Sequence, residues 1–273
     1  MHDPEAPSVL IVGGFLTGPY NYWPLRDRIL ARGAARVDIA PIWPVDWVAA
    51  GFVGLGPLLG RTGRAVLKTW RAGGKQPIII VGHSGGGLLT RLATSEVPYR
   101  GRRAAVAPQI GALVTLGTPH RLGPTSRWPA HPGHHAVRFL ERNLPGARFA
   151  PTTGYLSVGS RFVALASRRE PSAAGSRWRR IGGRMIEEVS TAMLGAWDGA
   201  DLGDGVVPHG LVHLPGARQL TFDDVLHGHL GGPWYADDRI VERWWPEAME
   251  VWQEALAARA EVGPPRERLR ESS

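Results

Sequence analysis

The chain has 273 residues, 43% of them hydrophobic and 21% charged, which is enough to bury a large core and excludes fibrous, collagen-like and wholly disordered proteins. It has no cysteine, so disulfides, thiolate metal ligands and a cysteine nucleophile are excluded. Lys and Arg (32) outnumber Asp and Glu (24) for a net charge of +8, but no recognition motif accompanies the charge, and we predict no nucleic-acid partner.

Short β-branched apolar runs alternate with helical patterns along the chain. The runs predict strands, several of them apolar throughout, as expected for strands covered on both faces: 8–12, 36–40, 77–81, 112–116, 156–158 and 218–222. The helical patterns cover 21–31, 57–71, 86–95, 181–194 and 237–260. This alternation predicts an α/β fold with a mostly parallel, doubly wound sheet and helices on both faces.

The pattern also suggests how the domain is divided. We expect one domain over 1–262, with cap or loop insertions at about 120–155 and 165–200 where Pro, Gly, His and Arg interrupt the alternation. A polar, flexible tail over 263–273 follows. The start of the sequence lacks a signal-peptide pattern and no stretch approaches the ~18 apolar residues of a membrane span, so we expect a cytoplasmic protein.

The segment from Ile78 to Leu89 carries the strongest chemical signal. An apolar strand leads into Gly82-His83-Ser84-Gly85-Gly86, and an apolar helix follows. This is the strand, G-x-S-x-G turn and helix of a nucleophile elbow, in which a strained turn presents the serine hydroxyl and the helix start offers free N–H groups to an oxyanion. We therefore predict Ser84 as a catalytic nucleophile.

A serine nucleophile needs a histidine base and an acid that orients it, and in this fold both follow the serine, the acid first. We assign the acid to Asp204, because the loop Leu202 to Pro208 frames it tightly with glycines. We assign the base to His227, which follows an apolar pair at the end of a predicted strand, with His229 as its nearest rival. Other acids and histidines in this part of the chain are weaker choices: Asp198, Asp201, Asp223, Asp224, His209 and His213.

The oxyanion of the reaction needs two N–H donors. One should be Gly85, directly after the nucleophile, and the other should come from the loop that follows the first strand. That loop contains Gly13-Gly14-Phe15, and we expect the Phe15 N–H to point at the oxyanion.

These segments together resemble the α/β-hydrolases, in particular the lipase-like branch with the GPI inositol-deacylase-like and lecithin:cholesterol acyltransferase-like enzymes. The resemblance includes the elbow, the Leu116-Gly117-Thr118-Pro119-His120 turn and the acid loop. His227 with Gly232-Pro233-Trp234-Tyr235 is similar to plant-plastid and cyanobacterial members, which have His-Ser-Pro where this chain has His227-Gly228-His229. The resemblance implies an α/β-hydrolase fold and ester chemistry, and its specificity for substrate is low.

Two further segments have competing interpretations. The uncharged run over 47–60 is either a pocket wall or lid that touches acyl chains, with transient contact to a membrane surface, or a buried connecting segment. The cluster His131-Pro132-Gly133-His134-His135 lacks a carboxylate partner for a metal, so we interpret it as a solvated loop and predict no metal. His120, in a Gly-Thr-Pro-His turn, is expected to have a structural role.

The sequence therefore predicts a serine esterase or lipase that works through a Ser84, Asp204 and His227 triad and an acyl-enzyme, on a small-molecule ester or lipid, without a cofactor. Acyl transfer to an alcohol would use the same residues and stays open. A non-catalytic binding protein of the same fold is the third possibility, and the complete triad argues against it. Acyl length, head group and oligomeric state leave no signal in the sequence.

Overall fold

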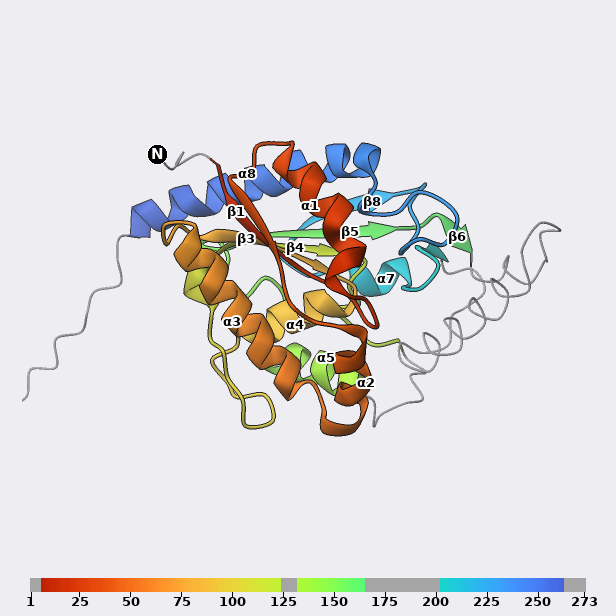
Figure 1. The fold of residues 1–273 in the computed structure, drawn as a ribbon, viewed down its shortest axis with the longest axis horizontal. Coiled ribbons are helices and arrows are strands. Elements are labelled where there is room, and N and C mark those ends of the chain that lie inside the picture. The colour runs from red at the N-terminus through yellow and green to blue at the C-terminus, as the bar shows by residue number, and fades with distance from the viewer. Residues whose placement is uncertain (1–5, 124–131, 165–201, 263–273) are drawn as a thin grey trace, which may run out of the picture.

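The computed structural model describes residues 6–123, 132–164 and 202–262 (Figure 1). Six parallel strands form the main sheet in the order β2-β1-β3-β4-β5-β8. All six predicted strands are present, with bounds β1 (Ser8–Val12), β2 (Arg36–Ile39), β3 (Ile78–His83), β4 (Ile110–Leu116), β5 (Gly154–Ser160) and β8 (Arg218–Phe222). The prediction of a doubly wound parallel sheet is confirmed.

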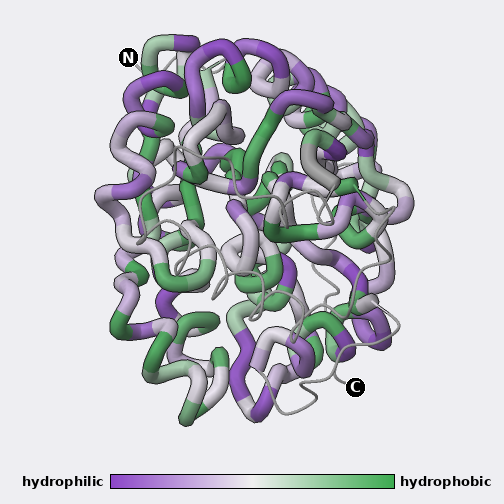
Figure 2. Tube along the Cα trace, turned by 90° about the vertical axis from the view of Figure 1, so that its right-hand side faces the viewer, coloured by the Kyte–Doolittle hydropathy of each residue, from purple (hydrophilic) through white to green (hydrophobic). Residues whose placement is uncertain are grey.

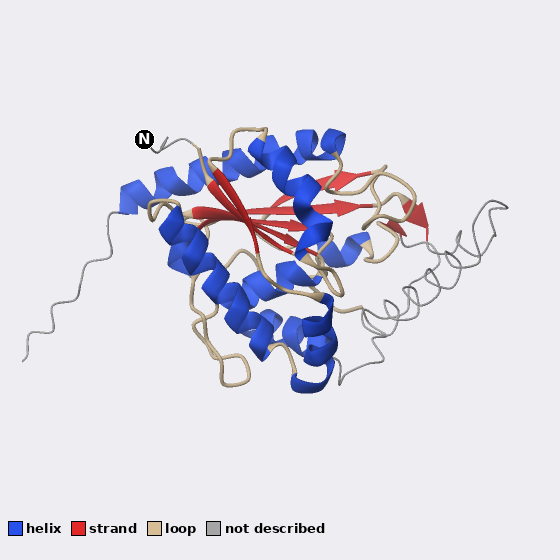
Figure 3. Cartoon of the chain, viewed as in Figure 1, coloured by secondary structure: helices blue, strands red, loops and turns tan. Residues whose placement is uncertain are grey.

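Helices cover both faces of this sheet. In Figures 1 and 3, α1 and α8 lie on one side of it, and α2, α3, α4 and α5 lie on the other. Their bounds are α1 (Trp23–Leu30), α2 (Pro44–Val53), α3 (Gly56–Ala72), α4 (Gly85–Thr94), α5 (Pro132–Asn143) and α8 (Asp238–Val262). Shorter elements are η1 (Pro19–Tyr22), η2 (Ala107–Gln109), α7 (His209–Val212) and a two-stranded antiparallel pair, β6 (Val163–Ala164) with β7 (Leu202–Gly203).

The sheet separates two apolar cores. Alternate residues of β1 face opposite sides: Val9 and Ile11 pack with α1 and α8, whereas Leu10 and Val12 pack with α3 and α4. All four are completely buried. Hydrophobic and hydrophilic stretches alternate along the tube in Figure 2, as expected where each helix turns one face to the sheet. Burial on both sides explains why the strand sequences are apolar throughout.

The uncharged run over 47–60 is buried on one side only, so the interpretation as a buried connecting segment holds for part of it. It forms most of α2 and the start of α3. Trp47 and Ala50 are buried, but Phe52 on the opposite face of α2 is 87% exposed. The glycines of this run obscured a helix that begins at Pro44, a residue that favours the first turn.

The interpretation of the histidine cluster as a solvated loop is wrong for the described part of it. Residues 132–135 begin α5, and His134 is buried. The signal for this helix is the apolar spacing of Ala136, Val137, Leu140 and Leu144, all of which pack in the core beside α4. His131, the helix predicted over 181–194, much of the predicted cap and the tail over 263–273 lie outside the described residues.

None of the helices within the described ranges is both long and apolar enough to cross a membrane.

Close contact between β1 and α4 depends on Gly86. A Cβ atom placed on Gly86 would lie 2.7 Å from the carbonyl oxygen of Gly13 and would overlap that of Val12. Backbone atoms of a buried strand cannot move aside. We therefore expect Gly86→Ala to lower the free energy of unfolding by more than about 2 kcal/mol, measured by urea denaturation.

Gly60→Ala is the matched control. Gly60 lies inside α3, and the nearest atom to an added Cβ would be the mobile end of Arg64 at 3.5 Å. Alanine in a helix interior should stabilise the protein by about 0.5–1 kcal/mol relative to glycine. If Gly86→Ala were as stable as the wild type, the close approach of β1 and α4 would be refuted.

Candidate active site

Ser84 occupies the sharp turn between β3 and α4. Its backbone has φ 53° and ψ −126°, a left-handed conformation that is rare for a residue with a side chain and that marks a strained turn. The Ser84 N–H donates to the carbonyl of Leu116 at 2.9 Å, and the Ser84 carbonyl accepts from the Thr118 hydroxyl at 2.9 Å. The end of β4 therefore holds the elbow in place, with Ser84 half-buried.

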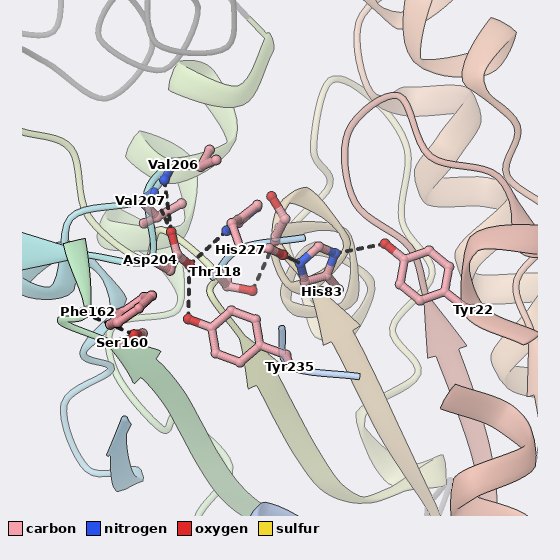
Figure 4. A network of polar contacts seen from close by, with 11 residues as sticks. Tyr22, His83, Thr118, Ser160, Phe162, Asp204, Val206, Val207, His227 and Tyr235 are labelled. Atoms are coloured by element: carbon pink, nitrogen blue, oxygen red, sulfur yellow. Dashed lines mark hydrogen bonds and ion pairs between the residues drawn. The ribbon is translucent and has the colours of Figure 1, made fainter. Parts of the chain in front are cut away.

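Asp204 and His227 form a hydrogen-bonded pair. Oδ2 of Asp204 lies 2.8 Å from Nδ1 of His227 and also accepts from the Tyr235 hydroxyl at 2.9 Å (Figure 4). Oδ1 accepts from the N–H groups of Val206 at 3.0 Å and Val207 at 2.8 Å. All these donors satisfy a carboxylate that has no exposed surface.

The charge of Asp204 determines the tautomer of His227. Burial alone would raise the pKa of Asp204, but the nearby His227 and the hydrogen bonds to His227, Val207 and Val206 outweigh it and lower the pKa below its usual value. An ionised carboxylate can only accept a hydrogen bond, so the Nδ1–H group of His227 donates to Asp204. Neutral His227 therefore carries its proton on Nδ1 and leaves Nε2 free to act as a base.

Two residues near Ser84 lie against the Asp204 and His227 pair: His83, which precedes Ser84, and Gly117, which follows the Leu116 carbonyl that Ser84 bonds. The rings of His83 and His227 are 4.8 Å apart, and a Cβ atom placed on Gly117 would lie 2.7 Å from Asp204 Oδ2 and 3.0 Å from His227 Nδ1. Gly117 has φ +56° as well, so this position requires glycine twice over.

Within the described ranges the Ser84 hydroxyl makes no hydrogen bond to His227. Such contacts are commonly long in unliganded enzymes and tighten in the substrate complex.

The two expected oxyanion donors are near neighbours. The Phe15 nitrogen lies 3.6 Å from a Cβ position built on Gly85, and Gly85 opens α4, where the first N–H groups have no acceptor within the helix. The ring of Trp47 contacts the same Gly85 position at 3.2 Å and meets the Phe15 ring edge-on at 5.7 Å. The apolar Trp47 ring therefore lies beside the two expected donors, and the pocket-wall interpretation of its segment stays a prediction.

A second chain of hydrogen bonds joins the Phe15 loop to His227. The N–H of Gly14 donates to the Tyr22 hydroxyl at 2.8 Å. That hydroxyl is 2.8 Å from His83 Nδ1, and His83 Nε2 is 2.8 Å from the carbonyl of His227 (Figure 4). A carbonyl only accepts, so His83 carries its proton on Nε2 and accepts the Tyr22 hydroxyl at Nδ1.

Burial keeps this chain of groups uncharged. Desolvation lowers the pKa of His83 to about 3 and raises the pKa of Tyr22 to about 12. His83 is therefore neutral at physiological pH, as its single proton on Nε2 requires.

The sequence analysis predicted no role for three residues of the site: Tyr22, His83 and Tyr235. His83 stands in the elbow motif at a position where any residue is allowed, and Tyr22 belongs to a short 3-10 turn without periodicity. Only Tyr235 had a signal, because it lies in the segment that carries the family resemblance.

The rival histidines and acids have other partners. His229 is exposed and contacts the Trp234 ring at 4.6 Å. Asp223 pairs with Arg161 at 2.7 Å, and Asp224 pairs with Arg243 at 2.9 Å. Asp198 and Asp201 lie outside the described residues.

The remaining histidines form contacts away from Asp204. His209 bonds Thr221 at 2.9 Å and is 3.2 Å from His213. His120 is buried with bonding distances to Thr115 and Arg91, as the structural role predicted for it requires. The part of the chain that the structure describes holds no group of three His, Asp or Glu side chains that could bind a metal.

Neither a protein-family model nor a curated protein matches this sequence. Solved structures do match. The mature form of lipase BlEst2 from Bacillus licheniformis is 14% identical with a TM-score of 0.57, over 91% of this chain and 94% of that chain. The chain has the α/β-hydrolase fold. Three features identify this fold: the parallel sheet, the elbow between β3 and α4, and the structural match.

Two further solved structures match. The propeptide form of BlEst2 is 14% identical with a TM-score of 0.56, over 91% of this chain and 51% of that chain. The pyrethroid hydrolase PytH is 16% identical with a TM-score of 0.46, over 89% of this chain and 98% of that chain. In the α/β-hydrolase fold the loops at the carboxyl ends of the strands carry the reactive groups, and Ser84, Asp204 and His227 all lie at this edge.

Tyr22→Phe should disconnect the Gly14 N–H from His83 while keeping the ring. Two buried polar groups then lose a partner, at about 1–3 kcal/mol each in the free energy of unfolding. If the Phe15 loop supplies an oxyanion donor, kcat should fall with KM nearly unchanged, because the interaction is made in the transition state. Urea unfolding and steady-state ester hydrolysis measure the two effects.

Tyr99→Phe provides the control. Tyr99 is equally buried, in the opposite core, and its hydroxyl makes one long contact of 3.4 Å to the Pro132 carbonyl. We expect a small loss of stability and no change in kcat. Equal effects of the two substitutions on kcat would show that Tyr22 has no special connection to the active site.

Proposed function

We propose that this chain is a serine hydrolase of carboxylic esters, an esterase or lipase. The single observation that carries the proposal is the buried, charged Asp204 bonded to Nδ1 of His227 next to a serine in a strained elbow. Strain of this kind costs about 1–3 kcal/mol, which folding alone does not require and which the exposure of a nucleophile explains. The likeness to a lipase structure supports the same class.

The proposed reaction begins when the Ser84 hydroxyl attacks the ester carbonyl and its proton passes to Nε2 of His227. Asp204 stabilises the imidazolium that forms. The negative oxygen of the tetrahedral intermediate accepts hydrogen bonds from the N–H groups of Phe15 and Gly85. His227 then protonates the leaving alcohol, and the acyl group stays on Ser84.

Water completes the reaction. His227 removes a proton from a water molecule that attacks the acyl-enzyme, and the acid leaves as Ser84 regains its proton. These steps use only the side chains and backbone of this chain, so the proposal needs no metal or cofactor. The apolar rings of Phe15 and Trp47 beside the oxyanion donors favour a substrate with an apolar acyl group.

Covalent labelling tests the nucleophile and the base together. A fluorophosphonate should modify Ser84 in the wild type, and Ser84→Ala should abolish labelling. His227→Ala should remove about as much kcat as Ser84→Ala, because nucleophile and base act as one unit, whereas His229→Ala should mainly change KM. Labelling rates and hydrolysis of p-nitrophenyl esters from acetate to palmitate are the measurements.

If Ser84→Ala were labelled as fully as the wild type, Ser84 would not be the nucleophile. If His229→Ala were inactive and His227→Ala active, the two histidines would exchange roles.

Asp204→Asn tests the acid. The amide oxygen can still accept from Val206 and Val207, so Tm should change little, but the amide favours the wrong tautomer of His227 and kcat should fall by up to ~10⁴. Asp224→Asn is the matched control, since Asp224 pairs with a half-exposed arginine at the surface and should leave kcat unchanged. Near wild-type activity of Asp204→Asn would refute Asp204 as the acid.

A further inference from the structure

A cavity lies between β2 and α3. Its volume is about 460 Å³, within the range of small-molecule sites. Leu10 and Trp43 contribute apolar walls, and four charged side chains line it: Asp38, Arg61, Arg64 and Lys68. Neither Ser84, Asp204 nor His227 lines this cavity, so it is separate from the proposed active site.

The helical repeat of α3 gathers the basic groups. Arg61, Arg64 and Lys68 are spaced by three and four residues along α3, which places them on one face of the helix. All three line the same cavity. Arg64 and Lys68 are exposed, so their charged ends are accessible to a ligand in the cavity.

The acidic groups nearby are already engaged. Asp38 accepts two hydrogen bonds from Arg36, at 2.6 and 2.8 Å. Asp46 lies 2.5 Å from Arg61. Each of these pairs is neutral in sum.

Arg64 and Lys68 remain. Within the described ranges neither forms an ion pair, although Lys68 is near enough to Asp38 to help lower the pKa of that carboxyl. The cavity and its immediate partners therefore carry a surplus of two positive charges.

Trp43 provides a surface for the uncharged part of a ligand. Its indole is 46% exposed, and the Tyr20 ring is 6.3 Å away. Leu10, which is fully buried, lies on the sheet side of the cavity. An apolar or aromatic group of a ligand would cover the exposed Trp43 ring while a charged group contacts α3.

We propose that this cavity binds a phosphomonoester, with the phosphate held by Arg64 and Lys68 and the organic part packed against Trp43. A phosphomonoester has a charge of about −1.5 to −2 near neutral pH, which matches the surplus of two positive charges, and its three terminal oxygens suit arginine and lysine donors. A carboxylate or phosphodiester has one charge and leaves half of the surplus uncompensated. The proposal does not depend on the ester hydrolase activity.

Calorimetric titration at low salt tests the proposal with two probes that share an aromatic body. The wild type should bind 4-nitrophenyl phosphate, a monoester, at least about tenfold more tightly than bis(4-nitrophenyl) phosphate, a diester. Arg64→Gln with Lys68→Gln should weaken monoester binding by about tenfold or more, because both phosphate contacts are lost. Thermal unfolding should confirm that this double variant is folded.

The matched control removes the same number of charges elsewhere. Arg71 lies in the last turn of α3 and Lys75 follows the helix; both are exposed and neither lines the cavity. Arg71→Gln with Lys75→Gln should bind the monoester as the wild type does. If both double variants bound the monoester equally weakly, net charge alone would explain the effect and the proposal would be overturned. Absence of saturable binding of the monoester to the wild type would also overturn it.

Vesicles distinguish a soluble ligand from a lipid headgroup. Phosphatidic acid presents a phosphomonoester at a membrane surface, and phosphatidylcholine vesicles with and without it are compared by co-sedimentation. Binding to phosphatidic acid that Arg64→Gln with Lys68→Gln abolishes assigns the site to a headgroup. If the protein binds the soluble monoester but not the vesicles, the site takes a free ligand. If the double variant binds vesicles as the wild type does and neither protein binds the soluble monoester, the site is refuted.

Discussion

The carboxylate of Asp204 is completely buried, and much of the carboxyl edge of the sheet is arranged around it. A buried charge without partners costs several kcal/mol, so its oxygens must find donors. Two come from its own loop at Val206 and Val207, and the others are the Tyr235 hydroxyl and the His227 ring. Loops that are far apart in the sequence are thereby held at one point.

The need to hold Asp204 and His227 together also constrains the backbone near the elbow at Ser84. Because Gly117 lies against both Asp204 and His227, the loop after β4 must pass without a side chain. The next residue, Thr118, then bonds the Ser84 carbonyl. Tyr22 and His83 form a buried hydrogen bond with each other. Through the Gly14 N–H and the His227 carbonyl, this pair connects the Phe15 loop to the backbone of His227. The elements proposed for catalysis are therefore linked by buried polar contacts, in which each group depends on its partner.

Charge has a different arrangement at the surface. Some of the basic side chains pair with acidic ones, as Arg36 does with Asp38 and Arg61 with Asp46. Along α3, Arg64 and Lys68 form no ion pair with any other residue that the structure describes, and both line a cavity with an aromatic wall. Basic side chains are thus concentrated at this cavity, where both the shape of the cavity and its charge favour an anion.

The sequence alone determined the six strands, the doubly wound sheet and the elbow, because each is encoded by neighbouring residues: apolar runs for buried strands, and glycines around Ser84 for the turn. It also singled out Asp204 and His227 as a pair, but only the fold brings residues 23 positions apart to a 2.8 Å contact. The partnership of Tyr22 with His83, 61 positions away, left no sequence signal, since it depends on which side chains meet in the interior. Helices α2 and α5 were missed because their glycines, prolines and histidines weaken local helix propensity, and tertiary packing of one apolar face outweighed it.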